Sequence, residues 1–219
     1  MKKSILLFFV FAMCSSGTKQ MYLDETGKKI SDKEYLNLRD NIDNPITSWH
    51  YMNADNVRVV QIVKPVYTPL IVRYPVLKKK IEDITGRKFE DKIFLISYNY
   101  LNDLCTENGN RLSKLDIANR KYRMNFSKTN IEKENKEIVI LFFFETGYIL
   151  ENSPDSPDEY FFTDTGNFLR ESIFRTRAFC GSFALIKPNG TALVKNGEDY
   201  LLRIEQLLKP ENWNQLFTE

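Results

Sequence analysis

The sequence predicts an α/β protein in which helices flank a mixed sheet and a small N-terminal extension precedes it. Three observations support this. Two nearly continuous apolar runs, residues 92–100 and 138–144, are typical of central strands covered on both faces. A helical segment lies between them, which is the order of a right-handed strand-helix-strand unit. A hairpin and a last helix follow, at 183–194 and 201–208.

Composition narrows the class of protein. The chain has 219 residues, of which 42% are hydrophobic and 27% charged, so it can form a packed core. This length suits one domain with an extension, or two small domains. His50 is the single histidine, which excludes a histidine-cluster metal site. We expect no metal and no cofactor.

The first fourteen residues predict export. Lys2 and Lys3 precede an apolar stretch, residues 5–12, that is far shorter than the ~20 residues of a spanning helix. Residues 1–14 are therefore interpreted as a signal segment, and residues 15–20 as a polar tether. The phrase FAMC, residues 11–14, resembles a bacterial lipobox, which implies lipidation of Cys14. Ordinary cleavage near the same residues is the equal alternative. The protein is expected in the periplasm, at the outer membrane as a lipoprotein, or secreted.

Charge gives little indication of a partner. Without residues 1–14 the 31 basic residues become 29, which equals the number of acidic ones. Neither nucleic acid nor an anionic membrane surface is implied, and membrane contact is expected only through a lipid on Cys14. The remaining expectation is an unidentified protein or peptide partner.

Residues 21–88 are expected to form the extension, a small α+β module. Ser31 and Glu34 have the spacing of a capping box that opens a short helix. Residues 41–56 are polar and turn-rich, residues 57–63 predict a strand, and 70–72 are at best an edge piece. Pro75 opens a helix that ends at Gly86. The opening phrase, residues 22–30, resembles that of many exported proteins of the Bacteroidetes group.

Residues 89–219 hold the remaining elements. Four residues, Leu112, Leu115, Ala118 and Tyr122, form a helical stripe, and residues 125–136 are interpreted as a polar linker. The acidic segment 151–164 is expected to be a solvated loop; it carries Asp155, Asp158, Glu159 and Asp164 but lacks the pattern of a calcium loop. A short helix is expected at 167–175, and the last helix carries Leu201, Ile204 and Leu208.

This element order, with Cys105 after the first strand and the hairpin phrase 183–190, resembles a thioredoxin-like domain. The resemblance implies a thioredoxin-like mixed sheet and an active site at Cys105, where the family holds a thiolate at a helix N-terminus. Two departures imply a degenerate site. Asn108 stands where a C-x-x-C pair has its second cysteine, and Ser182 stands where a cis-proline precedes the strand.

The same resemblance brings Cys180 near Cys105, and exported proteins tend to pair such cysteines. A structural disulfide, or two buried thiols, is the preferred interpretation, and a non-standard redox couple is the alternative. The sequence thus predicts an exported envelope protein whose degenerate domain serves binding or support and is not an enzyme. The alternative is a thiol-disulfide redox protein that uses Cys105 with Cys180.

Overall fold

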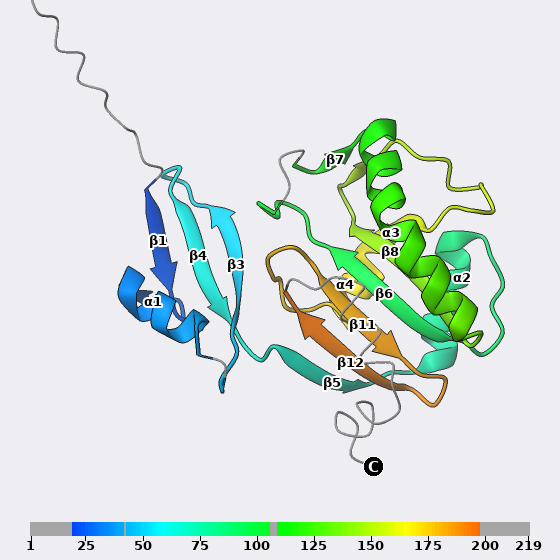
Figure 1. Ribbon diagram of the computed structural model, residues 1–219, viewed down its shortest axis with the longest axis horizontal. Helices are drawn as coiled ribbons and strands as arrows, with labels where there is room; N and C mark the ends of the chain where they lie inside the picture. The colour runs from blue at the N-terminus through cyan, green and yellow to red at the C-terminus, as the bar shows by residue number, and fades with distance from the viewer. Residues whose placement is uncertain (1–18, 42, 106–108, 198–219) are drawn as a thin grey trace, which may run out of the picture.

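The computed structural model describes residues 19–41, 43–105 and 109–197 (Figure 1). Cys14, the signal segment and the last predicted helix, 201–208, lie outside these residues. No helix in the described part of the chain combines the length and the apolar character needed to cross a membrane.

The N-terminal residues form a four-stranded sheet with the order β2-β1-β4-β3. Its strands are β1 (Gln20–Leu23), β2 (Lys29–Ile30), β3 (Thr47–Met52) and β4 (Arg58–Val63). Helix α1 (Asp32–Arg39) begins after Ser31, whose hydroxyl accepts the N–H of Glu34 as the capping pattern predicts. A separate small core of Tyr35, Val60 and Ile62 holds this sheet together. The turn-rich interpretation of residues 41–56 is wrong for β3, which pairs with β4 along its whole length.

The main sheet has six strands in the order β10-β8-β6-β11-β12-β5. These are β5 (Tyr67–Ile71), β6 (Ile93–Asn99), β8 (Ile138–Glu145), β10 (Phe161–Asp164), β11 (Ser182–Ile186) and β12 (Thr191–Asn196). β6, β8 and β10 are parallel, and β11 is antiparallel both to β6 and to its hairpin partner β12. A parallel pair beside an antiparallel hairpin, in the order β8-β6-β11-β12, is a thioredoxin-like mixed sheet. Two short strands, β7 (Arg111–Leu112) and β9 (Ile149–Leu150), pair separately.

β5 belongs to the main sheet, and α2 packs against it. β5 pairs with β12 as the edge strand, and α2 (Tyr74–Thr85) buries Leu77 and Ile81 in the main core. The helix ends at Gly86, whose φ of 68° is left-handed, as expected for a glycine C-cap. By hydrogen bonding, the boundary between the two sheets therefore lies between Val63 and Tyr67, within the range that the sequence assigns to the extension.

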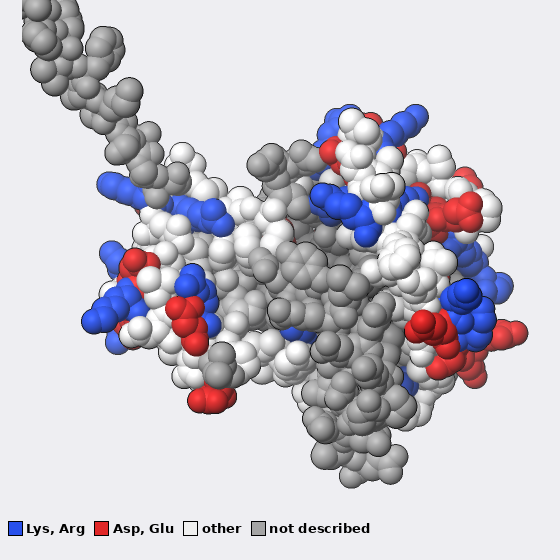
Figure 2. Space-filling view, in the orientation of Figure 1, with Lys and Arg blue, Asp and Glu red and all other residues white. Residues whose placement is uncertain are grey.

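Helix α3 (Lys114–Glu134) corrects two expectations. The prediction of a polar linker at 125–136 is wrong, because the helix continues to Glu134. Its residues include no glycine or proline that would end it earlier. The expected apolar stripe is wrong for α3: Leu112 is buried but lies in β7, outside the helix, and Leu115 and Tyr122 are 69% and 85% exposed. Ile117 and Ile131 face the core instead. Figure 2 shows uncharged surface over α3 with Lys and Arg beside it.

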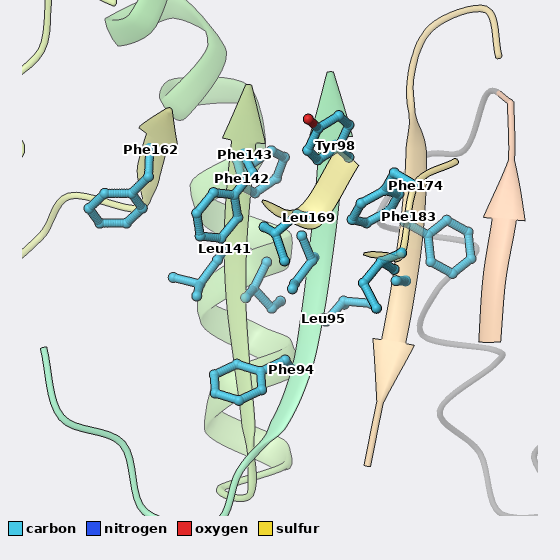
Figure 3. Close-up of a cluster of buried hydrophobic side chains, with 14 of the residues drawn as sticks. Phe94, Leu95, Tyr98, Leu141, Phe142, Phe143, Phe162, Leu169, Phe174 and Phe183 are labelled. Carbon is cyan, nitrogen blue, oxygen red and sulfur yellow. The ribbon is translucent and has the colours of Figure 1, made fainter. Parts of the chain in front are cut away.

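The main core consists of side chains from neighbouring strands and from the short helix α4 (Phe168–Ser172). Helices lie on both faces of the sheet, with α3 in front and α2 and α4 behind in the view of Figure 1. Figure 3 shows part of this core, in which aromatic and aliphatic residues of β6, β8, β10 and β11 gather around Leu169. Phe142 contacts Phe161, and Tyr98 stacks on Phe174 with ring centroids 4.5 Å apart. This packing fixes the strand ends at which the candidate site lies.

Candidate functional site at the carboxyl ends of the parallel strands

The carboxyl ends of β6, β8 and β10 meet at one edge of the main sheet. Glu145 and Asp164 are the last residues of two neighbouring strands and lie side by side in the register. The third strand, β6, leads directly into the loop that carries Cys105. In sheets with parallel strands such an edge is the usual place for a functional site.

Cys105 and Cys180 are joined by a disulfide at this edge. Their Cα atoms are 5.0 Å apart, inside the range that a disulfide requires. Cys105 is exposed in the β6–β7 loop, and Cys180 lies just before β11. Helix α3 begins at Lys114, nine residues after Cys105. Ser113 and Asp116 close that N-terminus with a reciprocal capping box.

Asp103 connects the two cysteine-bearing segments a second time. Its buried carboxylate accepts the N–H of Cys105 at 3.0 Å and the N–H of Gly181 at 3.1 Å. Burial raises the pKa of this carboxyl, and the backbone N–H donors act against the rise. Asp103 therefore joins the loops around the disulfide through hydrogen bonds, in addition to the bond between the sulfur atoms.

The backbone beside Cys180 is unusual. Cys180 has a φ of 61° and Gly181 a φ of 86°, both in the left-handed region. A Cβ on Gly181 would lie 2.5 Å from the carbonyl oxygen of Tyr98. Only glycine fits this approach of the β11 segment to the end of β6, so the tight turn that positions Cys180 depends on Gly181.

Glu145 forms ion pairs with two arginines next to the disulfide loop. Its carboxylate accepts from Arg177 at 2.8 Å and from the N–H of Leu101 at 2.8 Å, and Arg170 lies 3.6 Å away. Arg177 lies over the ring of Trp49, with the guanidinium carbon 5.6 Å from the centroid, and this contact joins the N-terminal sheet to the site. The buried charge of Glu145 is thus paired and hydrogen-bonded.

Asp164 has a structural role at the same edge of the sheet. It is fully buried and accepts the hydroxyl of Tyr98 at 2.9 Å together with the N–H groups of Leu169 and Arg170. Burial and the nearby carboxylate raise the pKa of Tyr98 above its ordinary value. Asp164 thereby fixes α4 against β6.

His50 contacts the segment before Cys180, but its geometry opposes catalysis. Its Nδ1 lies 2.8 Å from Arg58, which can only donate, so Nδ1 accepts and Nε2 carries the proton. The Nε2–H therefore donates to Ser48 Oγ at 2.8 Å and cannot activate that hydroxyl as a base. The ring stacks on Phe179 with centroids 3.8 Å apart. Burial, with a smaller effect of Arg58, lowers the pKa of His50 to about 4.

Comparisons with known proteins give limited information. No protein-family model matches the chain, and no curated protein matches it. Among solved structures, the N-terminal domain of PilB from Neisseria gonorrhoeae is similar at 11% identity and a TM-score of 0.40, over 62% of this chain and 93% of that one. The pneumococcal exposed lipoprotein thioredoxin Etrx1 from Streptococcus pneumoniae is similar at 13% identity and a TM-score of 0.36, over 74% and 97%. The thioredoxin-like assignment rests on the strand order above.

The acidic segment differs from its expected solvated state. Asp155 and Asp158 are exposed, whereas Glu159 and Asp164 are buried and bonded. The reason is strand β10, which the sequence interpretation missed and which carries the end of this segment into the sheet. In the described part of the chain no three potential metal ligands gather.

Sequence reasoning found the two cysteines and missed the residues around them, chiefly Asp103, Glu145 and Arg177. One signal was available. In the run Phe142-Phe143-Phe144 an apolar strand ends directly on Glu145, and Phe161-Phe162-Thr163 ends on Asp164. An acid at the carboxyl end of a buried strand is placed where parallel strands hold functional or structural polar groups. Arg177 lies in an irregular segment, where no periodicity indicates its position.

Proposed function

We propose that this protein is an exported envelope protein whose thioredoxin-like domain is non-catalytic and binds a protein or peptide partner. The observation that carries the proposal is the Cys105–Cys180 disulfide, which engages both cysteines at the carboxyl edge of the sheet. In this proposal the bond is structural.

The surroundings of the disulfide disfavour a reactive thiolate. Thiolates are stabilised by free backbone N–H groups and by a helix N-terminus. Here the N–H groups of Cys105 and Gly181 already donate to Asp103, and Ser113 and Asp116 occupy the N-terminus of α3. When ionised, the Asp103 carboxylate opposes a second negative charge on either sulfur.

Export is part of the proposal. Disulfides persist in oxidising compartments such as the periplasm and the cell exterior, and the predicted signal segment agrees with such a location. Labelling cells with a fatty-acid precursor tests the lipid anchor: incorporation that is lost in Cys14→Ser supports a lipoprotein. Export without incorporation supports simple cleavage, and retention of the chain in the cytoplasm contradicts the proposal.

A redox role is the second candidate, favoured by the exposure of Cys105. An external thiolate would attack Sγ of Cys105, the S–S bond would break, and Cys180 would leave as a thiolate that takes up a proton. The second thiol of the external dithiol would then displace Cys105, which leaves this protein reduced and the external partner oxidised.

Redox titration separates the two candidates. Equilibration of the oxidised protein with dithiothreitol buffers, followed by thiol labelling, gives the reduction potential of the bond. We expect a value below about −300 mV, as for structural disulfides. A value between about −270 and −120 mV, in the range of thiol oxidoreductases, would support the redox candidate. Mixed disulfides trapped in cells by Cys180→Ser and absent from the Cys105→Ser/Cys180→Ser double variant would do the same.

A further inference from the structure

One arginine of α3 lies on the side of the helix that faces the sheet. The buried residues of α3 are Ile117, Ser127 and Ile131. At 100° per residue, Arg120 falls inside the arc of about 80° that these three positions span, and its side chain is partly buried. Its Nη1 lies 3.5 Å from Oδ1 of Asn99, the last residue of β6. The guanidinium therefore lies at the carboxyl end of the strand that leads into the disulfide loop.

This guanidinium has no acidic partner within the described part of the chain. No carboxylate oxygen there lies within 4.0 Å of Arg120, and apart from Nη1 its N–H groups have no acceptor. Asp103 and Asp116 act on it from farther away, and their carboxylates already accept N–H groups of the cysteine segments and of Ser113. Burial lowers the pKa of Arg120 from its ordinary value. An arginine that faces the interior is normally paired with an anion.

The charges around Arg120 favour an anion with a single negative charge. Arg123 lies one turn further along α3 and is exposed, whereas Asp103 and Asp116 bring negative charge to the same region. A phosphate with two negative charges would be repelled by these two carboxylates. A carboxylate carries one charge and fits the planar guanidinium, which can donate two parallel N–H bonds to its oxygens.

We propose that Arg120 binds a carboxylate of the partner, from an acidic side chain or a free carboxy terminus, at the end of β6 beside the disulfide. This inference rests on the proposed function, in which the domain binds a protein or peptide, and it names the chemical group that the partner presents. The carboxylate accepts the N–H groups of Arg120 that have no acceptor in the described chain. It also neutralises a charge that faces the sheet.

A peptide titration of the oxidised protein tests the inference. The probes are acetylated triglycine with a free carboxy terminus, its carboxy-terminal amide, and an acetylated, amidated glycine tripeptide with glutamate in the middle. The readout is the NMR signal of the Asn99 side-chain amide, because Asn99 contacts Arg120 and stays present in every variant. We expect saturable shifts with dissociation constants on the order of 1–10 mM for a peptide that carries a carboxylate. The uncharged amide should produce no shift.

The probes also separate the sources of the anion. Binding of triglycine alone would assign the site to a free carboxy terminus, and binding of the glutamate peptide alone would assign it to an acidic side chain. Either result supports the inference. Inorganic phosphate, compared at the same ionic strength, should bind at least about threefold more weakly. Equal shifts with the amide and the carboxylate peptides, or tighter binding of phosphate, would overturn the inference.

Substitutions show whether the guanidinium itself binds. Arg120→Lys keeps the charge and removes the planar fork, so it should weaken carboxylate binding at least about fivefold. Arg120→Met keeps an unbranched stem without a charge and should abolish the shift. Arg123→Met is the matched control, because Arg123 is an exposed arginine of the same helix with no ion pair among the described residues, and it should change the constant less than about twofold. Equal losses in Arg120→Met and Arg123→Met would mean general surface attraction and would overturn the inference.

A structural role for Arg120 would give different results. Arg120→Met removes an unpaired charge that faces the sheet, so the midpoint of urea unfolding should stay the same or rise. A lower midpoint would mean that Arg120 supports the fold through Asn99, and this would overturn the inference. The reduction potential of the disulfide should be the same in Arg120→Met and in the wild-type protein. A lower potential in the variant would mean that the guanidinium stabilises a thiolate of Cys105, which also overturns it.

Failure of this inference and failure of the proposed function are distinguishable. A wild-type reduction potential below about −300 mV without carboxylate binding would leave the non-catalytic domain in place and require a partner of other chemistry. A potential in the range of thiol oxidoreductases together with carboxylate binding would overturn the proposed function and leave the site at Arg120.

Discussion

At Gly181 a single missing Cβ permits the turn that brings Cys180 to Cys105. Gly181→Ala places a methyl group 2.5 Å from the Tyr98 carbonyl oxygen and also strains the left-handed backbone. Gly27→Ala is the matched control, because Gly27 has a φ of 87°, close to the 86° of Gly181, with nothing within 4 Å of the added Cβ. We expect Gly181→Ala to lower the free energy of unfolding by about 2 kcal/mol more than Gly27→Ala in urea titrations. Equal costs would show that the close approach is relieved.

His50 predicts a pH dependence of stability. Its pKa falls from 6.5 to about 4 on folding, so between these values the unfolded chain binds more protons than the folded one. The contribution of His50 to the free energy of unfolding should therefore be fully present above pH 6.5 and should be lost as the pH falls towards 4. Because the ring is only half-buried, we expect a loss of about 1–2 kcal/mol.

His50→Gln provides the control for this prediction, since it removes the titrating ring and keeps a polar side chain. In urea unfolding, the variant should lose less stability between pH 6.5 and 4 than the wild-type protein does. Identical slopes for the two proteins would assign the pH dependence to carboxyl groups.

At the scale of elements, α3 shows where pattern reasoning succeeds and where it misleads. Its existence followed from the spacing of residues between two apolar runs. Its inner face did not, because Leu115 and Tyr122 are as hydrophobic as the residues that face the core. Periodicity identifies one side of a helix, but only the position of the sheet decides which side is buried. The strands β3 and β10 were missed since both carry polar residues and lie beside turn signals, and β10 has only four residues.

Glu159 joins α3 to the segment that leads into β10. Its carboxylate accepts the N–H groups of Tyr160 and Phe161, and it lies 2.7 Å from the ammonium of Lys121 on α3. Glu159→Gln keeps an acceptor and removes the charge, which leaves Lys121 with 22% exposure and no carboxylate. We expect a loss of about 2–3 kcal/mol in urea unfolding.

The exposed pair Lys79–Asp83 on α2 gives the comparison for Glu159. Asp83→Asn removes the charge of an ion pair in which both side chains are more than half exposed, so it should cost less than about 0.5 kcal/mol. A loss of similar size in both variants would contradict the role assigned to Glu159.

At the scale of the whole molecule, the disulfide closes 75 residues of chain, including α3, β8 and β10. In the chain-entropy model such a loop contributes about 4 kcal/mol to stability. Cys105→Ala/Cys180→Ala should therefore lower the free energy of unfolding by up to that amount. We expect the folded structure to persist, because Asp103 still joins the two loops.

Asp103 itself provides the second arm of this experiment. Removing its carboxylate with Asp103→Ala in the disulfide-free background should cost more than the same change in the wild-type protein, since the two connections substitute for each other. Additive losses would mean that the two connections act independently.

For the molecule as a whole, the central strands, the hairpin and the mixed sheet followed from long apolar runs and a clear turn. The proximity of Cys105 and Cys180 followed from the implied fold. The network around them did not, because Asp103, Glu145 and Arg177 come from three separate segments. Local sequence does not predict that these three residues come together, since their proximity depends on how the strand ends are aligned across the sheet.

The placement of β5 has a practical consequence for any attempt to shorten the chain. A fragment that starts at residue 89 would lack β5 and α2, so β12 would become an uncovered edge with unpaired N–H and C=O groups. Such an edge is a template for strand addition from another molecule. Val194 and Leu193 would lie on it, which makes the shortened fragment prone to aggregation. A soluble fragment of the main sheet has to begin before Tyr67.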